Sequence, residues 1–139
     1  MQETIRIRTQ GRSTIDITAK VEKFVSQSGV ENGLCNLFIQ HTSASLIFCE
    51  NADPDVRSDL ENFMQQIIRD GDPLFRHRAE GSDDMPAHIK SALTNNQLTL
   101  SIKNGKIILG IWQGLYLFEH RLQPQKRIIS HHFIGEQNI

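Results

Sequence analysis

Residues 97–110 read QLTLSIKNGKIILG, and this stretch decides the class of fold. Apolar and polar residues alternate over residues 97–102, which is typical of a strand with one buried face. Asn104 and Gly105 form the dipeptide that most strongly favours a two-residue hairpin turn, and residues 106–110 return as a second strand. The stretch therefore predicts antiparallel pairing.

The same alternation appears at the start of the chain, in residues 4–8 and 13–17. Gln10 and Gly11 lie between the two segments, so the pattern predicts an opening hairpin. Thr18 then provides an N-cap for a helix that Gly29 would end.

Two short apolar segments, residues 34–40 and 46–49, predict strands that are buried on both faces. Asp53 and Pro54 follow as an N-cap and a first-turn proline, and they predict a helix that ends near residues 70–71. Its expected apolar face consists of Val56, Leu60, Phe63, Met64 and Ile67. This spacing is that of an amphipathic helix.

The rest of the chain predicts a long loop over residues 71–84, a short helix over 86–93, and strands over 111–121 and 127–134. Strands flank clustered helices, and no regular alternation of strand and helix is seen. We therefore expect an α+β fold, a mixed and largely antiparallel β-sandwich with a few helices, in a single domain spanning 1–139.

The composition bears on whether the protein binds nucleic acid or a membrane, and on the compartment in which we expect it. Fifteen basic and sixteen acidic side chains give a net charge of −1, so the basic footprint of nucleic-acid binding is missing. No apolar run is long enough to span a membrane, and the N-terminus has no signal-peptide pattern, so we expect a cytoplasmic protein. Cys35 and Cys49 lack metal-binding spacing and are expected to be free thiols.

Residues 81–90, GSDDMPAHIK, place two carboxylates, a proline and an imidazole at the start of a helix. Asp83 or Asp84 can act as the N-cap, which explains the acids and Pro86 without any further role. His88 is less simply explained, because the positive helix end opposes its protonation and leaves a lone pair for a metal ion. Asp84, four residues earlier, could orient the ring.

Three further polar clusters interrupt apolar segments. QHTSAS at 40–45 contains His41 and Ser43, and ENADPD at 50–55 begins with Glu50. WQGLYLFEHR at 112–121 is apolar on both faces of a strand, which predicts that both faces are covered and suggests a subunit interface. It ends in Glu119, His120 and Arg121.

His41, His88 and His120 each lie at the edge of a separate element, beside an acid or a hydroxyl. Three neutral imidazoles with an open coordination position suit a divalent ion, with zinc preferred. The hypothesis is that the three histidines meet around one ion.

Four motifs in the same order resemble the YjbQ-like family, also labelled secondary thiamine-phosphate synthase: QHTSASL at 40–46, ENADPDVRSD at 50–59, HRAEGSDDMPAHIKS at 77–91 and WQGLYLFEHR at 112–121. The resemblance implies an α+β sandwich, a homotrimer, metal binding through histidines and weak thiamine-phosphate synthase activity. The family motifs include His77 as well as the three histidines above. Two positions depart from the family pattern: Ile111 replaces a threonine, and Cys49 replaces an asparagine.

The leading hypothesis is therefore a metal-dependent enzyme that acts on a small phosphorylated or otherwise anionic molecule. Glu50, Asp84 or Glu119 would act as the general base or orient a ligand. The expected anion-binding residues are Ser43, Lys90, Gln113 and Arg121. Two alternatives remain open: a non-catalytic trimeric protein that binds a metal or metabolite, and a purely structural role for the polar motifs.

Overall fold

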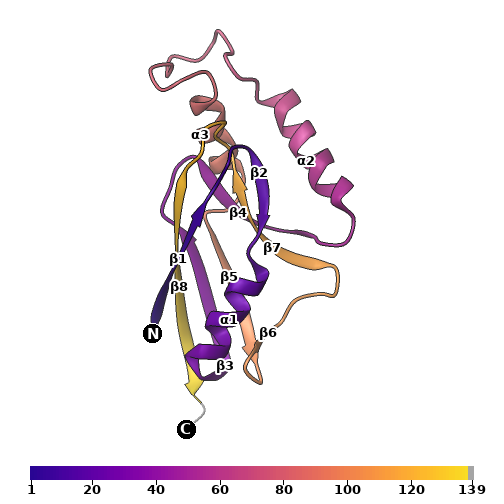
Figure 1. The fold of residues 1–139 in the computed structure, drawn as a ribbon, viewed down its shortest axis with the longest axis vertical. Coiled ribbons are helices and arrows are strands. Elements are labelled where there is room, and N and C mark those ends of the chain that lie inside the picture. Colours follow the sequence, from indigo (N-terminus) through magenta and orange to yellow (C-terminus); the bar gives the residue numbers. More distant parts are fainter. Residues whose placement is uncertain (138–139) are drawn as a thin grey trace.

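Two antiparallel sheets and three helices form the protein in the computed structural model, which describes residues 1–137 (Figure 1). The predicted domain extends to residue 139, and its last two residues lie outside the described part. The strands are β1 (Gln2–Arg8), β2 (Ser13–Asp16), β3 (Val30–Ile39), β4 (Ala44–Glu50), β5 (Gln97–Lys103), β6 (Lys106–Ile107), β7 (Gln113–Glu119) and β8 (Lys126–Gln137). The helices are α1 (Thr18–Ser28), α2 (Pro54–Ile67) and α3 (Asp84–Leu93).

The larger sheet has the strand order β1-β8-β3-β5-β6, and the smaller has the order β2-β7-β4. Every strand pair among the described residues is antiparallel, which confirms the α+β class. The predicted hairpin is confirmed: β5 pairs with β6, and Asn104 and Gly105 both have the positive φ angles that this turn requires, 53° and 77°.

The predicted hairpin at the start of the chain is wrong, although both of its strands form. β1 pairs with β8 in the larger sheet, whereas β2 pairs with β7 in the smaller one. Gly11, with a φ of 119°, helps to turn the chain between the sheets, and a Cβ there would lie 2.8 Å from the Leu122 carbonyl oxygen. Alternation identifies a strand but does not choose its partner.

Thr18 begins α1 but does not cap it. The N-cap position belongs to Ile17, and the Thr18 hydroxyl instead accepts a hydrogen bond of 2.9 Å from the Leu115 N–H on β7. Gly29 ends the helix with a φ of 74°, as predicted. Asp53 caps α2 as predicted, because its Oδ1 accepts from the Asp55 N–H at 2.9 Å. That helix ends at Ile67, before the predicted end.

The main core lies between the two sheets and includes the buried face of α1. A second apolar cluster joins α2 to the other face of the smaller sheet, through Ile47, Met64, Ile68, Tyr116 and Phe118. The prediction that both faces of the 112–121 segment are covered is therefore confirmed for β7. The second cover comes from α2 of the same chain.

Two apolar surfaces predicted to be buried are exposed. On β3, Leu34 and Phe38 are 48% and 42% exposed, because the outer face of the larger sheet is open in this region. On α2, only Met64 of the predicted apolar face is buried, and Val56, Phe63 and Ile67 are 40%, 57% and 55% exposed. We call these last three residues the α2 stripe.

Both cysteines are free: Cys35 is buried and Cys49 is half-buried. Burial raises the pKa of the Cys35 thiol to about 11, so this side chain behaves as an apolar core residue. No helix within residues 1–137 combines the length and the apolar character needed to cross a membrane.

Candidate metal centre

A cluster of four potential ligands forms where the loop after α2 reaches the start of α3. The loop contributes His77 and Glu80, and the first turns of α3 contribute Asp84 and His88. One ligand atom from each of the four lies within 4.8 Å of the others. Because zinc ligands lie about 2 Å from the ion, atoms that share one ion are roughly 3–4 Å apart, so the 2.6 Å contact between His77 Nε2 and Asp84 Oδ2 would have to lengthen slightly to admit one.

Asp84 is the centre of the cluster. Its Oδ2 lies 2.6 Å from His77 Nε2 and 3.1 Å from His88 Nε2, so two imidazole nitrogens converge on a single carboxylate oxygen. The side chain of Asp84 is only 2% exposed, while those of His77, His88 and Glu80 are 41%, 32% and 65% exposed. The cluster is thus anchored in the protein interior and open to solvent on its outer side.

The two nitrogens of His88 both face oxygen atoms. Nδ1 lies 3.0 Å from the Thr42 carbonyl oxygen, which can only accept, so Nδ1 carries the proton. A neutral ring then has a lone pair on Nε2, pointing at the Asp84 carboxylate. This arrangement requires either an imidazolium ring or a cation shared by Nε2 and the carboxylate. A hydrogen bond from Nδ1 to a backbone carbonyl is the usual support of a metal-binding histidine.

Arg121, in the connection after β7, holds the acidic residues in place. Its guanidinium donates from Nε to Asp83 Oδ2 at 2.9 Å, from Nη1 to Asp84 Oδ1 at 2.7 Å, and from Nη2 to the Glu80 carbonyl at 3.0 Å. Oδ2 of Asp84 therefore remains for the histidines. Asp83 also accepts from the Leu122 N–H, so neither aspartate uses its side chain to cap α3.

The electrostatics of the cluster favour ionised acids. Burial by itself raises the pKa of Asp84, but the hydrogen bond with His77 and the charge of Arg121 outweigh it, and the pKa lies below its usual range. Burial likewise opposes ionisation of Asp83, and the pKa is lowered overall by the Leu122 N–H and by Arg121.

Pockets lie on two sides of the cluster. One of about 320 Å³ is lined by His41, Thr42, His88, Ser91, Ala92 and Asn96. Another of about 200 Å³ lies against the loop and includes His77, Arg78 and Ser82. A small molecule in either pocket would lie beside one of the two clustered histidines.

The structure does not bring His41 and His120 into this cluster, and both have other contacts. His41 Nε2 accepts a hydrogen bond of 2.8 Å from the Ile128 N–H, so a neutral ring carries its proton on Nδ1 and has no free lone pair. Burial, then the charge of Arg127, lower the pKa of His41 despite the opposing effect of Glu119, which favours this neutral form.

His120 is buried, and its Nε2 lies 2.9 Å from the Ser45 hydroxyl. The Ser45 hydroxyl also lies 2.6 Å from the Thr94 hydroxyl, whose own proton can be donated to the Lys90 carbonyl oxygen at 2.7 Å. Burial, followed by the charge of Lys90, lowers the pKa of His120 to about 3. The ring is a neutral core residue rather than a surface ligand. The predicted arrangement, His41, His88 and His120 around one ion, is thus replaced by a cluster that keeps His88 alone.

Two of the three predicted catalytic acids have structural contacts. Glu119 is fully buried and pairs with Arg127, with an Nε–Oε1 distance of 2.8 Å. Glu50 Oε2 accepts from the N–H groups of Ala52 and Asp53 at 3.0 and 2.7 Å, which fixes the turn before α2. Asp84 alone of the three lies in the cluster.

The predicted anion-binding residues are also separated. Lys90 is fully buried and its Nζ has no hydrogen-bond partner within residues 1–137; burial, followed by the Arg12 charge, lowers its pKa. Ser43 accepts from Arg127 at 3.0 Å. Gln113 accepts from the Gly110 N–H. Arg121 is occupied by the acids described above.

Gln113 and Glu50 do share a pocket of about 380 Å³. The two family departures, Cys49 and Ile111, line the same pocket, as does Trp112. These departures therefore alter a surface that does not include the histidine cluster.

Sequence reasoning from residue patterns did not identify His77 and Glu80. Both lie in a segment without periodicity, so no helix or strand pattern predicts which way their side chains point. The available signal was the HRAEGSDD stretch itself, in which His77 and Glu80 come shortly before the start of the helix at Asp84. The family motif included His77, whereas Glu80 was not singled out.

Comparisons with known proteins agree on a single family. The family model described as "UPF0047 protein YjbQ-like" matches residues 3–136. A UPF0047 protein of Synechocystis sp. is 49% identical over 135 residues, covering 97% of this chain and 92% of that protein. The YjbQ protein of Escherichia coli O157:H7 is 38% identical, covering 97% and 98% of the two chains.

Solved structures show the same fold. A conserved hypothetical protein from Thermus thermophilus matches with a TM-score of 0.86 at 32% identity, over 95% of this chain and 99% of that one. An uncharacterised YjbQ/UPF0047 protein from Clostridium acetobutylicum matches with a TM-score of 0.84 at 35% identity, over 96% and 99%.

Proposed function

The chain belongs to the UPF0047 (YjbQ-like) family, and on that premise we propose that it is a metal-dependent enzyme acting on a small phosphorylated or otherwise anionic metabolite. The observation that carries the proposal is the convergence of His77 Nε2 and His88 Nε2 on Asp84 Oδ2. Two imidazoles and a buried carboxylate are a common ligand set for zinc.

The residues of the cluster have distinct tasks in this proposal. His77, His88 and Asp84 hold the ion, and Arg121 fixes Asp84 so that Oδ2 faces it. A bound zinc ion would polarise a phosphoryl or carbonyl oxygen and lower the pKa of a coordinated water. Glu80 is the most exposed member of the cluster, and its carboxylate lies where it could accept a proton from such a water.

The open outer side of the cluster supports a small substrate. The neighbouring pockets have volumes of about 320 and 200 Å³, enough for a small metabolite and not for a polymer in an enclosed site. An anionic group would be attracted to the ion and to Arg78, which lines the smaller pocket. Formation of thiamine phosphate, the activity implied by the family resemblance, is one reaction of this class.

A homotrimer is the second part of the proposal. The α2 stripe is an apolar helix face with no cover within residues 1–137, and Figure 1 shows α2 at the margin of the molecule. Exposed apolar patches of this kind commonly form subunit contacts. We assign the stripe to contact with further copies of the same chain.

The decisive experiment measures bound metal in protein purified without added metal or chelator. Wild-type protein should contain about one zinc ion per chain by mass spectrometry, because three ligands and an open position form a complete site. His77→Ala and His88→Ala should each reduce zinc to background. His132→Ala, which removes an exposed histidine on β8, is the matched control and should retain it.

Activity separates the enzyme from the alternative binding protein. Zinc-loaded wild-type protein should turn over a substrate in a screen of phosphoesters and of thiamine-phosphate formation, and removal of zinc should abolish turnover. Zinc binding without turnover in the whole screen would favour the binding protein. Full activity of zinc-free protein would overturn the metal-dependent mechanism.

A further inference from the structure

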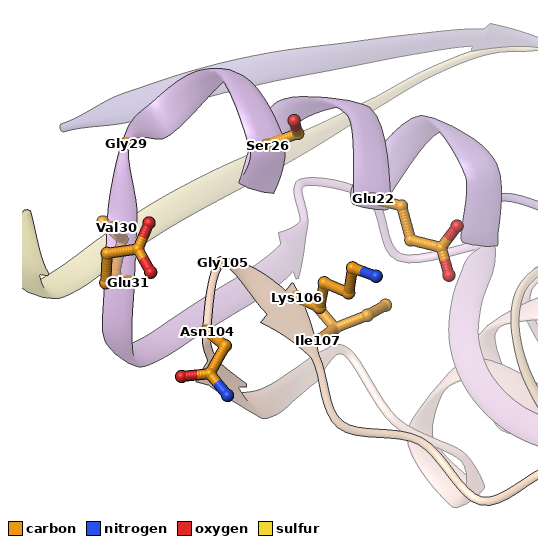
Figure 2. Close-up of a pocket in the computed structure, with 9 residues that line it drawn as sticks. All are labelled: Glu22, Ser26, Gly29, Val30, Glu31, Asn104, Gly105, Lys106 and Ile107. Carbon is orange, nitrogen blue, oxygen red and sulfur yellow. The ribbon is translucent and has the colours of Figure 1, made fainter. Parts of the chain in front are cut away.

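A further cavity, of about 630 Å³, opens between α1 and the β5–β6 hairpin (Figure 2). We call it the α1–hairpin cavity. Its lining includes no residue of the histidine cluster, and its volume lies in the range of small-molecule sites. Neither the family motifs nor the proposed function accounts for it.

Backbone contacts fix the walls of this cavity. The Gly105 N–H donates to the Glu31 carbonyl oxygen at 3.0 Å, which ties the tip of the hairpin to the start of β3. A Cβ on Gly105 would lie 3.7 Å from Glu31 Oε1, so the carboxylate rests against the turn. At Gly29, by contrast, a Cβ would meet no atom of residues 1–137 within 4 Å.

The charges around the cavity are predominantly negative. Glu22 and Glu31 contribute two carboxylates, and among the described residues of the lining Lys106 is the single cation. The C-terminal end of α1 also borders the cavity and carries the negative pole of the helix dipole. No basic residue lies in the last turn of α1 to neutralise it.

The cavity also has an apolar wall. Val30 is buried in the main core, and Ile107 packs against that core from the hairpin. Figure 2 shows the side chains of Glu22, Lys106 and Ile107 extending between the helix and the hairpin. Ile107 is therefore the main apolar side chain that the cavity offers to a ligand, and the rest of the lining is largely polar.

We propose that the α1–hairpin cavity binds a small organic cation, a protonated amine carried on an apolar body. The ammonium group pairs with the Glu31 carboxylate beside the Gly105 turn, and the apolar body packs along Ile107 towards Glu22 at the other end of the cavity. Lys106 disfavours dications and accommodates a neutral or weakly anionic substituent. This site is independent of the proposed metal centre.

The test uses tryptamine as the cation and tryptophol as its neutral counterpart, which has a hydroxyl in place of the ammonium. Both are titrated into isotopically labelled full-length protein, and amide resonances are followed by NMR. Tryptamine should shift Gly29 and Gly105 saturably, and tryptophol should bind more weakly by up to about fivefold, the most that a partly exposed ion pair contributes.

The second part of the test removes the negative charges that line the cavity, one at a time. Glu31→Gln should weaken tryptamine binding by roughly threefold or more, and Glu22→Gln, at the other end of the cavity, should weaken it less. Asp59→Asn, which removes an exposed carboxylate on α2, should leave it unchanged. Zinc content should be equal in all three variants. Equal binding of tryptophol and tryptamine, an unchanged affinity in both glutamine variants, or shifts confined to other residues would each overturn the proposal.

Discussion

At the scale of the residue, the functional state of each histidine depends on what its two nitrogens contact. His41 Nε2 accepts a backbone N–H, His120 Nε2 lies against a serine hydroxyl, and His88 Nε2 lies against a carboxylate. The sequence identified all three as candidates because of their polar neighbours. It could not distinguish them, because the deciding partners Ile128, Ser45 and Thr42 lie 87, 75 and 46 positions away and are brought close only by folding.

His131 is a further histidine with a distinct role. It is fully buried against the rings of Phe24 and Phe133, and neither of its ring nitrogens has a partner within the described chain. Burial lowers its pKa to about 4, from an ordinary value of 6.5. Protonation therefore opposes folding, and the ring acts as an acid-sensitive core residue.

This environment predicts a pH dependence of stability. Below pH 6.5 the unfolded chain binds a proton at this position that the native chain does not bind until about pH 4, so stability is fully present above pH 6.5 and is lost as pH falls from there towards 4. His131→Leu should remove this loss, which amounts to about 2 kcal/mol between pH 7.5 and pH 5. Urea unfolding at these two pH values, at fixed protein concentration, measures it.

The control for this prediction is His132→Leu, because the His132 ring is exposed on the face of β8 opposite to His131. That variant should show the same loss of stability on acidification as wild-type protein. A wild-type slope retained in His131→Leu would show that the buried ring does not titrate in this range.

At the scale of the element, residue patterns predicted strands and helices well and their connections poorly. The Asn104-Gly105 turn and the Asp53 cap are local signals and both are confirmed. The link between β7 and α3 is not local, because Arg121 reaches two aspartates 37 and 38 residues earlier in the chain. The start of α3 is thus positioned by a strand end, and the proposed metal site depends on that contact.

Arg121→Lys should test this dependence. A lysine has the charge of arginine but cannot donate to two carboxylates and a carbonyl at once, so Asp84 loses part of its support. Zinc affinity, measured by competition with a chromophoric chelator, should fall by about tenfold or more, as for other residues that support metal ligands. Arg76→Lys is the control, because Arg76 is exposed in the loop that contributes His77 and Glu80. This change should leave zinc affinity unchanged. Equal affinities in the two variants would remove the positioning role of Arg121.

At the scale of the whole molecule, the single chain leaves apolar surface uncovered. The α2 stripe repeats at helical spacing, and its residues are 40–57% exposed although the pattern predicted a buried face. The helix uses its neighbouring side, at Met64, to cover the smaller sheet. The amphipathic pattern therefore predicted that this face of α2 is buried. We propose that another copy of the chain buries it.

A charged pair in the stripe should separate the subunits. Phe63→Glu with Ile67→Glu places two carboxylates in the proposed contact, where they would be desolvated without partners. Light scattering after size exclusion should give three times the mass of one chain for wild-type protein and a single-chain mass for the double variant. Leu74→Glu, at an 86% exposed loop position, is the control and should remain trimeric. A trimeric double variant would place the contact on another surface.

The sequence by itself determined the α+β class, most strands and helices, the free cysteines and, through motifs, the family. These features follow from local periodicity, turn chemistry and residue order, which are all present in the linear chain. The tertiary structure decided the strand partners, the exposure of α2 and the grouping of His77, Glu80, Asp84 and His88. A metal site depends on distances of a few ångströms between atoms of an aperiodic loop and a helix start, and long-range contacts such as those of Arg121 and Thr42 fix them.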